Sequence, residues 1–414
     1  MTRFPESECG QWLGAILVAG AAIAALLGSI WLPRVPRFVP AKLSFAPLPY
    51  FVGSRIALQA VGLAPHAEWS TLGHARILTT NDGRRYLSLQ APGSAQVIAS
   101  DGRSIAARTL DILPAPPKSE TLLAVACYDD GVTFYDARSL AMLGVLATGG
   151  SPSDLAVENG RLAITDNDGS AFTVLERAPW RLTRFPLAAS EEVAAAPGNR
   201  FFATLRDWEG VGAVATVAAR PRITKTGMTA EGIAVDARRD RLYVANINDG
   251  SVLELDAQTM EPLDRIEVGL RVFSLALNAD GTILYAVRNG GMIHDDGDVV
   301  EIATQPRLHI IARSALLDLP LGIALDQRAQ RLFVTDEAAD VIYVLDPRTL
   351  RAIHAPVPTC HTPWDPTYDA RSGRLYVPCA RNDRLDILNA STLARIPGAP
   401  IRTAGYPLAV AVWR

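Results

Sequence analysis

The chain has 414 residues, of which 49% are apolar and 20% are charged, and its formal net charge is −3. This composition is typical of a folded globular protein and excludes a disordered one, and the length allows two or three domains. The small net charge gives no support to a nucleic acid or an acidic surface as a partner.

An uncharged apolar run occupies residues 12–31, between Trp12 and Trp31. A helix of about twenty such residues crosses the hydrocarbon layer of a membrane with an aromatic ring at each interface. The alternative is a cleaved signal peptide. However, the tail at residues 1–11 carries one Arg against two Glu, and no small-x-small cleavage site follows the run. We therefore predict a signal anchor, a single transmembrane helix, at residues 12–31.

The charges beside this segment favour one orientation. Arg34, Arg37 and Lys42 follow it, whereas Arg3 alone precedes it. The positive-inside rule, applied to these residues alone, places the folded part of the chain in the cytoplasm.

Two segments precede the repeats. Residues 32–49 contain five prolines and no apolar periodicity, which predicts an extended and stiff spacer. Residues 50–113 hold short alternating runs separated by turns such as Asn81-Asp82-Gly83. That pattern predicts a small β-sandwich with Trp69 in its core, followed by a proline-rich linker at residues 114–119.

Residues 120–414 repeat with a period of about forty residues. The clearest copy spans residues 231–269 and contains four alternating runs, with an Asn-Asp-Gly turn at 248–250. The start of the second run recurs at Leu123, Leu162, Phe201, Leu242, Leu284, Leu332 and Leu375. Four strands in each such unit are typical of a β-propeller blade, so the sequence predicts an all-β chain with a seven-bladed propeller.

The two ends of the repeat region are complementary. The first unit lacks an inner strand, and Gly405 to Val412 repeats the inner-strand pattern without a unit to follow it. We expect this C-terminal strand to complete the blade that begins at Thr121, which closes the ring and removes two sheet edges.

The run Arg241-Leu-Tyr-Val-Ala-Asn246, followed by a strand that ends at Asp256, resembles the YVTN family of bacterial β-propeller repeats, and weaker copies begin at Arg331 and Arg374. Residues 86–102 are similar to bacterial immunoglobulin-like domains, although no cysteine pair accompanies them. For the single-pass inner-membrane protein predicted from residues 12–31, these resemblances imply that the large domain is extracytoplasmic or periplasmic, against the local count of basic residues. They imply a fold and no particular activity.

Ligands of propellers usually bind at the mouth of the central channel, where inner strands begin and second strands end. Acidic residues at these positions, edged by aromatic ones, are suited to a cation, an amine or a sugar. The alternative is that such a mouth is polar because it touches water. The candidate ligand-binding residues are Asp154, Asp166, Glu192, Glu231, Asn246, Arg288, Asp336, Trp364, Asp365 and Tyr406.

Three cysteines are expected on one face of the propeller. Cys127 and Cys379 occupy equivalent positions of the first and last blades, and Cys360, followed by His361, lies in the loop that enters the last blade. These four residues are candidates for a soft-metal site that would bind zinc or copper(I). A disulfide with Cys360 as the common partner and three buried free thiols are the alternatives.

No G-x-S-x-G, H-E-x-x-H, C-x-x-C-H or P-loop motif occurs, so no catalytic residue is assigned and no cofactor other than a metal is considered. The first hypothesis is a membrane-anchored binding or scaffold protein that recognises a protein or a small molecule at the propeller face. The second is a lactonase-type or other hydrolase at the channel mouth. Resemblance to metal-dependent propeller lactonases would assign the metal there to Glu231, Asn246, Asp166 and Asp154. The third is a redox or soft-metal protein that uses the cysteines.

Overall fold

The computed structural model of the protein describes residues 41–45, 48–80, 82–116, 121–169, 171–187, 189–208, 211–290 and 297–414. Within these ranges the chain is all-β, apart from one short 3-10 helix, η1 (Ala380–Asn382). The predicted membrane segment at residues 12–31 lies outside the described residues. In the part that is described, no helix is long and apolar enough to cross a membrane.

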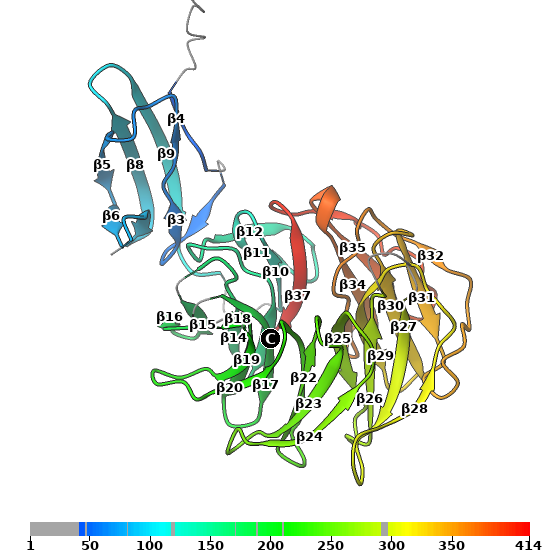
Figure 1. Ribbon diagram of the computed structural model, residues 1–414. Helices are drawn as coiled ribbons and strands as arrows, with labels where there is room; N and C mark the ends of the chain where they lie inside the picture. The colour runs from blue at the N-terminus through cyan, green and yellow to red at the C-terminus, as the bar shows by residue number, and fades with distance from the viewer. Residues whose placement is uncertain are drawn as a thin grey trace, which may run out of the picture.

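The N-terminal strands form a small unit beside the main body (Figure 1). Its core contains Tyr50, Leu87 and Val97, and Trp69, predicted as the core aromatic, packs against it while partly exposed. Its first strand pairs Lys42 with Val61, so the end of the predicted spacer belongs to this unit. The strands are β1 (Lys42–Leu43), β2 (Tyr50–Phe51), β3 (Arg55–Ala57), β4 (Ala60–Val61), β5 (Glu68–Gly73), β6 (Ala75–Thr79), β7 (Arg85–Leu89), β8 (Gly93–Ser100) and β9 (Ile105–Leu113).

The remaining strands form seven antiparallel sets of four within the described ranges. The first set joins β10 (Leu122–Cys127), β11 (Gly131–Asp136) and β12 (Met142–Leu146) to β37 (Pro407–Trp413). The second is β13 (Leu155–Glu158), β14 (Arg161–Ile164), β15 (Phe172–Arg177) and β16 (Trp180–Phe185), and the third is β17 (Ser190–Ala196), β18 (Arg200–Trp208), β19 (Val211–Thr216) and β20 (Ile223–Gly227). The fourth is β21 (Ala230–Asp236), β22 (Arg241–Asn246), β23 (Ser251–Asp256) and β24 (Pro262–Glu267), and the fifth is β25 (Val272–Leu277), β26 (Ile283–Arg288), β27 (Asp298–Ala303) and β28 (His309–Arg313). The sixth is β29 (Pro320–Asp326), β30 (Arg331–Asp336), β31 (Val341–Leu345) and β32 (Val357–Pro358), and the seventh is β33 (Thr367–Asp369), β34 (Arg374–Cys379), β35 (Arg384–Asn389) and β36 (Ile401–Arg402).

The inner strands of these sets pack against one another in a closed ring. Each contacts the next in the order β13, β17, β21, β25, β29, β33 and β37, and β37 returns to β13. The sheets follow one another around the body in Figure 1, and the red strand β37 returns beside β10. The ring therefore brings the beginnings of all the inner strands together at one end of a central axis.

The tight turn between first and second strands recurs because its chemistry recurs. In three of the sets, an Asp at the end of the inner strand accepts hydrogen bonds from backbone N–H groups two and three residues later. A residue with positive φ, the conformation that Gly, Asn and Asp tolerate best, completes each turn. The Asp residues are Asp236, Asp326 and Asp369, and the positive-φ residues are Asp240, Gln330 and Gly373.

The predicted closure by the C-terminal strand is confirmed. Strand β37 pairs antiparallel with β10, from Leu122 with Trp413 to Cys127 with Pro407. Trp413 is fully buried, its Nε1–H donates to the carbonyl of Gly160, and its ring lies 6.1 Å from that of Phe134. The end of the chain is thus fixed to its own sheet and to the next one.

The N-terminal unit is joined to the propeller by a continuous sheet, which the prediction of a β-sandwich separated by a linker did not anticipate. Strand β2 pairs in parallel with β12 on one side and with β9 on the other. Phe51 of β2 packs among propeller residues, with its ring 5.8 Å from Phe134 and 5.6 Å from Trp180. Gly144 permits this approach, because a Cβ there would lie 2.8 Å from the Phe51 ring.

Candidate functional site

Carboxyl groups from four different sheets gather where the inner strands begin. Asp154 precedes β13, Glu192 and Glu231 lie near the starts of β17 and β21, and Asp365 precedes β33. Burial raises the pKa of Glu192 well above its usual value, and the carboxylates of Asp365, Asp154 and Glu231 raise it further. Four predicted residues therefore come together, and we call them, with Glu191, the mouth carboxyls.

Two of the mouth carboxyls also connect neighbouring sheets. Asp154 accepts hydrogen bonds from the N–H groups of Leu155 at 2.7 Å and of Val193, in the next sheet, at 2.9 Å. Glu192 repeats this contact by accepting from the N–H of Ile233 at 3.1 Å. Burial raises the pKa of Asp154 to about 6, and these hydrogen bonds oppose the shift because they stabilise the charged form.

Arg206 lies between two of the mouth carboxyls. Its Nε is 3.1 Å from Glu231 Oε2, and its Nη1 is 3.8 Å from Glu191 Oε1. The Glu231 side chain is 7% exposed and that of Arg206 is 42% exposed. The guanidinium is therefore accessible from solvent, whereas the carboxylate is buried. Burial and the Glu191 charge raise the pKa of Glu231, and Arg206 opposes that shift.

Asp365 completes the group from the last sheet. A Cβ on Gly322 would lie 2.5 Å from Asp365 Oδ1, so the absence of a side chain at residue 322 makes room for this carboxyl. Burial and the Asp154 carboxylate raise the pKa of Asp365 to about 7, and a hydrogen bond with Ser274 opposes the shift. Asp365 therefore takes up and releases a proton near neutral pH.

The predicted residues at the ends of second strands have contacts inside their own sheets. Asn246 and Asp336 are fully buried and Asp166 nearly so. Asn246 bonds to Thr226 and Ser251, Asp336 accepts from the N–H groups of the turns around it, and Arg288 Nε pairs with Asp298 at 2.8 Å. Asn246, Asp336 and Arg288 are therefore held by groups of their own sheets, whereas one carboxylate oxygen of Asp166 has no hydrogen-bond partner among the described residues.

The two predicted aromatic residues, Trp364 and Tyr406, lie just before the inner strands β33 and β37. Trp364 accepts a hydrogen bond from Thr335 through its carbonyl. Tyr406 has a φ of 57° and packs edge-on against Tyr128, with 6.3 Å between ring centroids. The Tyr128 hydroxyl in turn donates to Asp168 at 3.1 Å. This hydrogen bond connects the sheet that β37 closes to the second sheet.

The cysteines adopt the disulfide arrangement that uses Cys360. Cys360 and Cys379 are bonded, with Cα atoms 5.6 Å apart, while Cys127 is buried and free beside Thr133. A carboxylate oxygen of Asp386 lies within 4.8 Å of both sulfurs, but Asp386 is ion-paired with Arg395 at 2.8 Å. His361 pairs instead with Asp340 at 3.1 Å, so the four predicted metal ligands do not share one centre.

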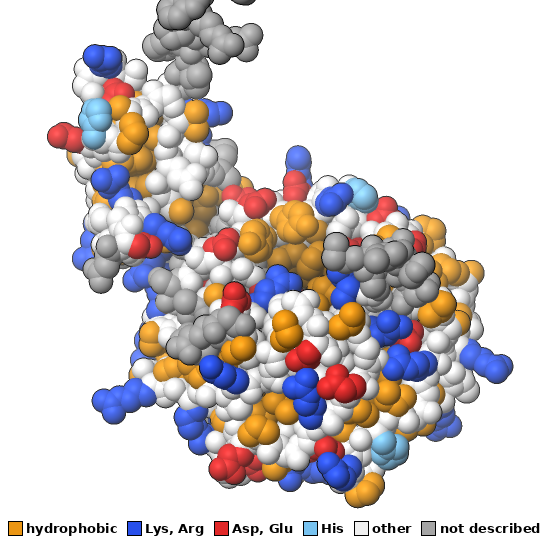
Figure 2. Space-filling view, in the orientation of Figure 1, with side chains coloured by type: hydrophobic (Ala, Val, Ile, Leu, Met, Phe, Trp, Pro, Cys, Tyr) orange, Lys and Arg blue, Asp and Glu red, His pale blue; other side chains and the backbone are white. Residues whose placement is uncertain are grey.

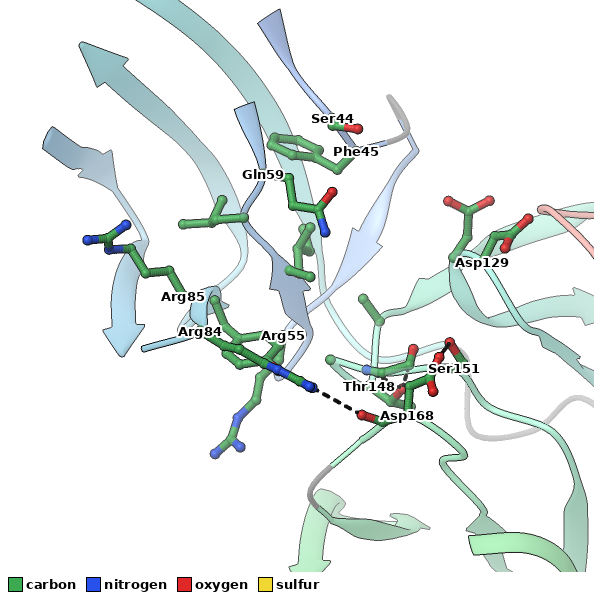
Figure 3. Close-up of a pocket in the computed structure, with 18 of the residues that line it drawn as sticks. Ser44, Phe45, Arg55, Gln59, Arg84, Arg85, Asp129, Thr148, Ser151 and Asp168 are labelled. Atoms are coloured by element: carbon green, nitrogen blue, oxygen red, sulfur yellow. Dashed lines mark hydrogen bonds between the residues drawn. The ribbon is translucent and has the colours of Figure 1, made fainter. Parts of the chain in front are cut away.

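A cleft between the N-terminal unit and the propeller was not predicted. It encloses about 550 Å³ and is lined on one side by residues of β3 and the β6–β7 turn and on the other by residues 129–130 and 147–151. Figure 3 shows Arg84 reaching across it to the carbonyl of Asp168, a hydrogen bond of 3.3 Å.

Arg206 and Glu191 were not identified as site residues from the sequence. Glu191 could have been found from its position beside Glu192 in the sequence. No sequence pattern marked Arg206.

No family model matches the chain, and no curated protein matches it. Among solved structures it is similar to a candidate 6-phosphogluconolactonase of Bacteroides uniformis, with 13% identity and a TM-score of 0.58, over 71% of this chain and 99% of the other. The periplasmic gluconolactonase of Pseudomonas aeruginosa gives 15% identity and a TM-score of 0.57, over 72% and 99% of the two chains. A β-propeller domain from Myceliophteria thermophila gives 13% identity and a TM-score of 0.53, over 65% and 93%. At these identities the likeness establishes the fold alone, and the chain is a β-propeller protein.

Proposed function

We propose that this protein is a membrane-anchored, extracytoplasmic binding protein whose seven-bladed propeller recognises a small cationic or polyhydroxylated ligand at the mouth carboxyls. The ring of seven inner strands supports the blade number, and the N-terminal β-strand unit supports an immunoglobulin-like sandwich. The disulfide between Cys360 and Cys379 supports an oxidising, periplasmic location, because such bonds are rare in the cytoplasm. The YVTN resemblance and the anchor at residues 12–31 remain part of the proposal.

The observation that carries the proposal is the excess of acid over base at the mouth. Among the described residues, five carboxyls gather there around the guanidinium of Arg206. Their mutual repulsion and burial keep part of them protonated, and a bound cation would replace those protons. A sugar would bind instead through hydrogen bonds that its hydroxyl groups donate to the carboxylate oxygens.

Binding is tested by titrating the full chain with Ca²⁺, spermidine and glucosamine and following its melting temperature. A ligand of the mouth stabilises the wild type, and this shift is lost in Glu192→Gln and Asp365→Asn. Glu261→Gln, which removes an exposed acid from the β23–β24 turn, is the matched control. Absence of a shift with all three compounds, or an equal shift in the mouth variants and the control, rejects the proposal.

A second candidate is the hydrolysis of a sugar lactone, favoured by the position of Arg206. Its partly exposed guanidinium is suited to stabilise the oxyanion that forms on the lactone carbonyl. Glu231 or Glu191, both with a raised pKa, would act as the general base for the attacking water. The fold is shared with the gluconolactonase of Pseudomonas aeruginosa, although that likeness by itself implies no activity.

This second candidate is tested by pH-stat titration of δ-gluconolactone hydrolysis against the spontaneous rate. We expect Arg206→Gln to lower kcat/KM about a hundredfold or more, which is the usual effect of removing an oxyanion donor. A wild-type rate equal to the spontaneous rate excludes the lactonase and leaves the binding proposal intact.

A further inference from the structure

The cleft between the N-terminal unit and the propeller has the size and the rigidity of a ligand site. Its volume of about 550 Å³ is within the usual range for small-molecule pockets. Its walls are fixed to each other, because Arg55 N–H donates to the carbonyl of Ala147 at 2.8 Å and Ala147 N–H donates to Ser54 Oγ at 3.2 Å. A ligand would therefore bind without ordering either wall, which lowers the cost of association.

A basic group in this cleft has no ion-pair partner among the described residues. The Arg55 guanidinium accordingly forms no ion pair or hydrogen bond there, and its charge acts on a second arginine, Arg184. Burial and the Arg55 charge lower the pKa of Arg184 to about 10. Tyr86 lines the same cleft and is 9% exposed, and its hydroxyl has no hydrogen-bond partner among the described residues. Together these groups form an end of the cleft that is suited to a carboxylate.

An acidic group is equally unpaired on the other wall. The carboxylate of Asp129 accepts no hydrogen bond and forms no ion pair in the described part of the chain. Burial, Asp130 and Asp383 raise its pKa, and no basic residue opposes the shift. In Figure 3, Asp129 lies on the propeller side, across the cleft from Gln59 and Ser44, whereas Arg55 lies on the opposite wall beside Arg84.

We propose that this cleft binds a short peptide with free termini, its ammonium group at Asp129 and its carboxylate at Arg55 and Tyr86. A ligand with a single charge would leave the charged group on the opposite wall without a partner. A zwitterion provides a partner for the charged group on each wall. Between the two ends, Ile56 and Leu58 offer apolar contact, and Gln59 and Thr148 offer hydrogen bonds to peptide groups. The site is separate from the mouth carboxyls, since none of them lines the cleft.

The test uses the full chain and alanine peptides of two to five residues, each also prepared with an acetylated amino end or an amidated carboxyl end. Isothermal titration gives Kd for the wild type, Arg55→Gln and Asp129→Asn. Arg103→Gln and Asp111→Asn, which make the same charge changes at exposed positions of the N-terminal unit, are the controls. At the best length, we expect amidation and Arg55→Gln each to weaken binding about tenfold or more, and acetylation and Asp129→Asn to do the same.

The pairing of probe and variant identifies each end. Arg55→Gln should not weaken binding of the amidated peptide further, and Asp129→Asn should not weaken binding of the acetylated one. The proposal is overturned if capping either end changes the wild-type Kd less than twofold at every length. The capped peptides decide the question on wild-type protein even where a variant unfolds. Glu231→Gln, at the mouth, should leave peptide affinity unchanged, so failure here is distinguishable from failure of the proposed function.

Discussion

Replacement of Trp413 by Ala should destabilise the propeller more than any other single change near the end of the chain. Trp413 is fully buried on the closing strand β37, and its ring packs against Phe134 and Trp180. A buried Trp removes about 150–250 Å² from water. At about 25 cal/mol per Å², the transfer contribution is roughly 4–6 kcal/mol, and measured Trp-to-Ala costs are about 3–5 kcal/mol.

The substitution also leaves the carbonyl of Gly160 without its donor, the Trp413 indole N–H at 3.0 Å. Gly160 is exposed, so water can replace the lost donor and the missing hydrogen bond adds little to the cost. We therefore expect the free energy of unfolding to fall by about 4 kcal/mol for Trp413→Ala. Trp413→Phe, which keeps most of the ring volume and loses the hydrogen bond, should cost about 1–2 kcal/mol.

Urea unfolding followed by far-UV circular dichroism measures both variants without depending on tryptophan emission. Because β2 continues the sheet of β10–β12, the N-terminal unit and the propeller should unfold in one transition. Equal midpoints for the wild type and Trp413→Ala would refute the reasoning, since they would mean that β37 contributes nothing to closure.

Three further predictions concern the junction, the disulfide and the mouth. Gly144→Ala should cost about 1–3 kcal/mol by overpacking against Phe51 and should expose the junction to limited proteolysis; an unaltered digestion pattern contradicts this. Cys360→Ser, or reduction of the bond to Cys379, should lower the free energy of unfolding by about 3 kcal/mol for a loop of this separation, and reductant should then have no effect on the variant. The pKa of Asp365 is raised to about 7, so between about pH 4 and 7 the folded state holds a proton that the unfolded state releases. The resulting contribution to stability is fully present below about pH 4 and is lost as the pH rises through about 7. Asp365→Asn should flatten the fall in unfolding free energy between pH 4 and 7, and an unchanged slope argues against the shift.

The sequence predicted four of the mouth carboxyls because their position is repeated. Asp154, Glu192, Glu231 and Asp365 stand at or just before the inner strands, and a regular repeat places equivalent residues at equivalent places around the axis. At the ends of the second strands, the repeat predicts the position of a residue along its strand but not its hydrogen-bond partners. Asn246 is buried and bonds to hydroxyl groups of the strands β20 and β23, and Asp336 is buried and accepts from the backbone N–H of Leu319. Sequence position does not say which way a polar side chain points.

The strands, their turns and the closing partner of β10 were determined by local sequence, because alternation with a period of two and Asp-containing turns act over a few residues. The attachment of the N-terminal unit was decided by tertiary structure alone. Strand β2 has two residues, too few for any periodic signal, and its partners β9 and β12 are brought to it by the folding of two separate cores. Arg55 and Asp129 line one cleft for the same reason. Their proximity depends on how these cores pack, and packing between distant segments leaves no periodic trace in the sequence.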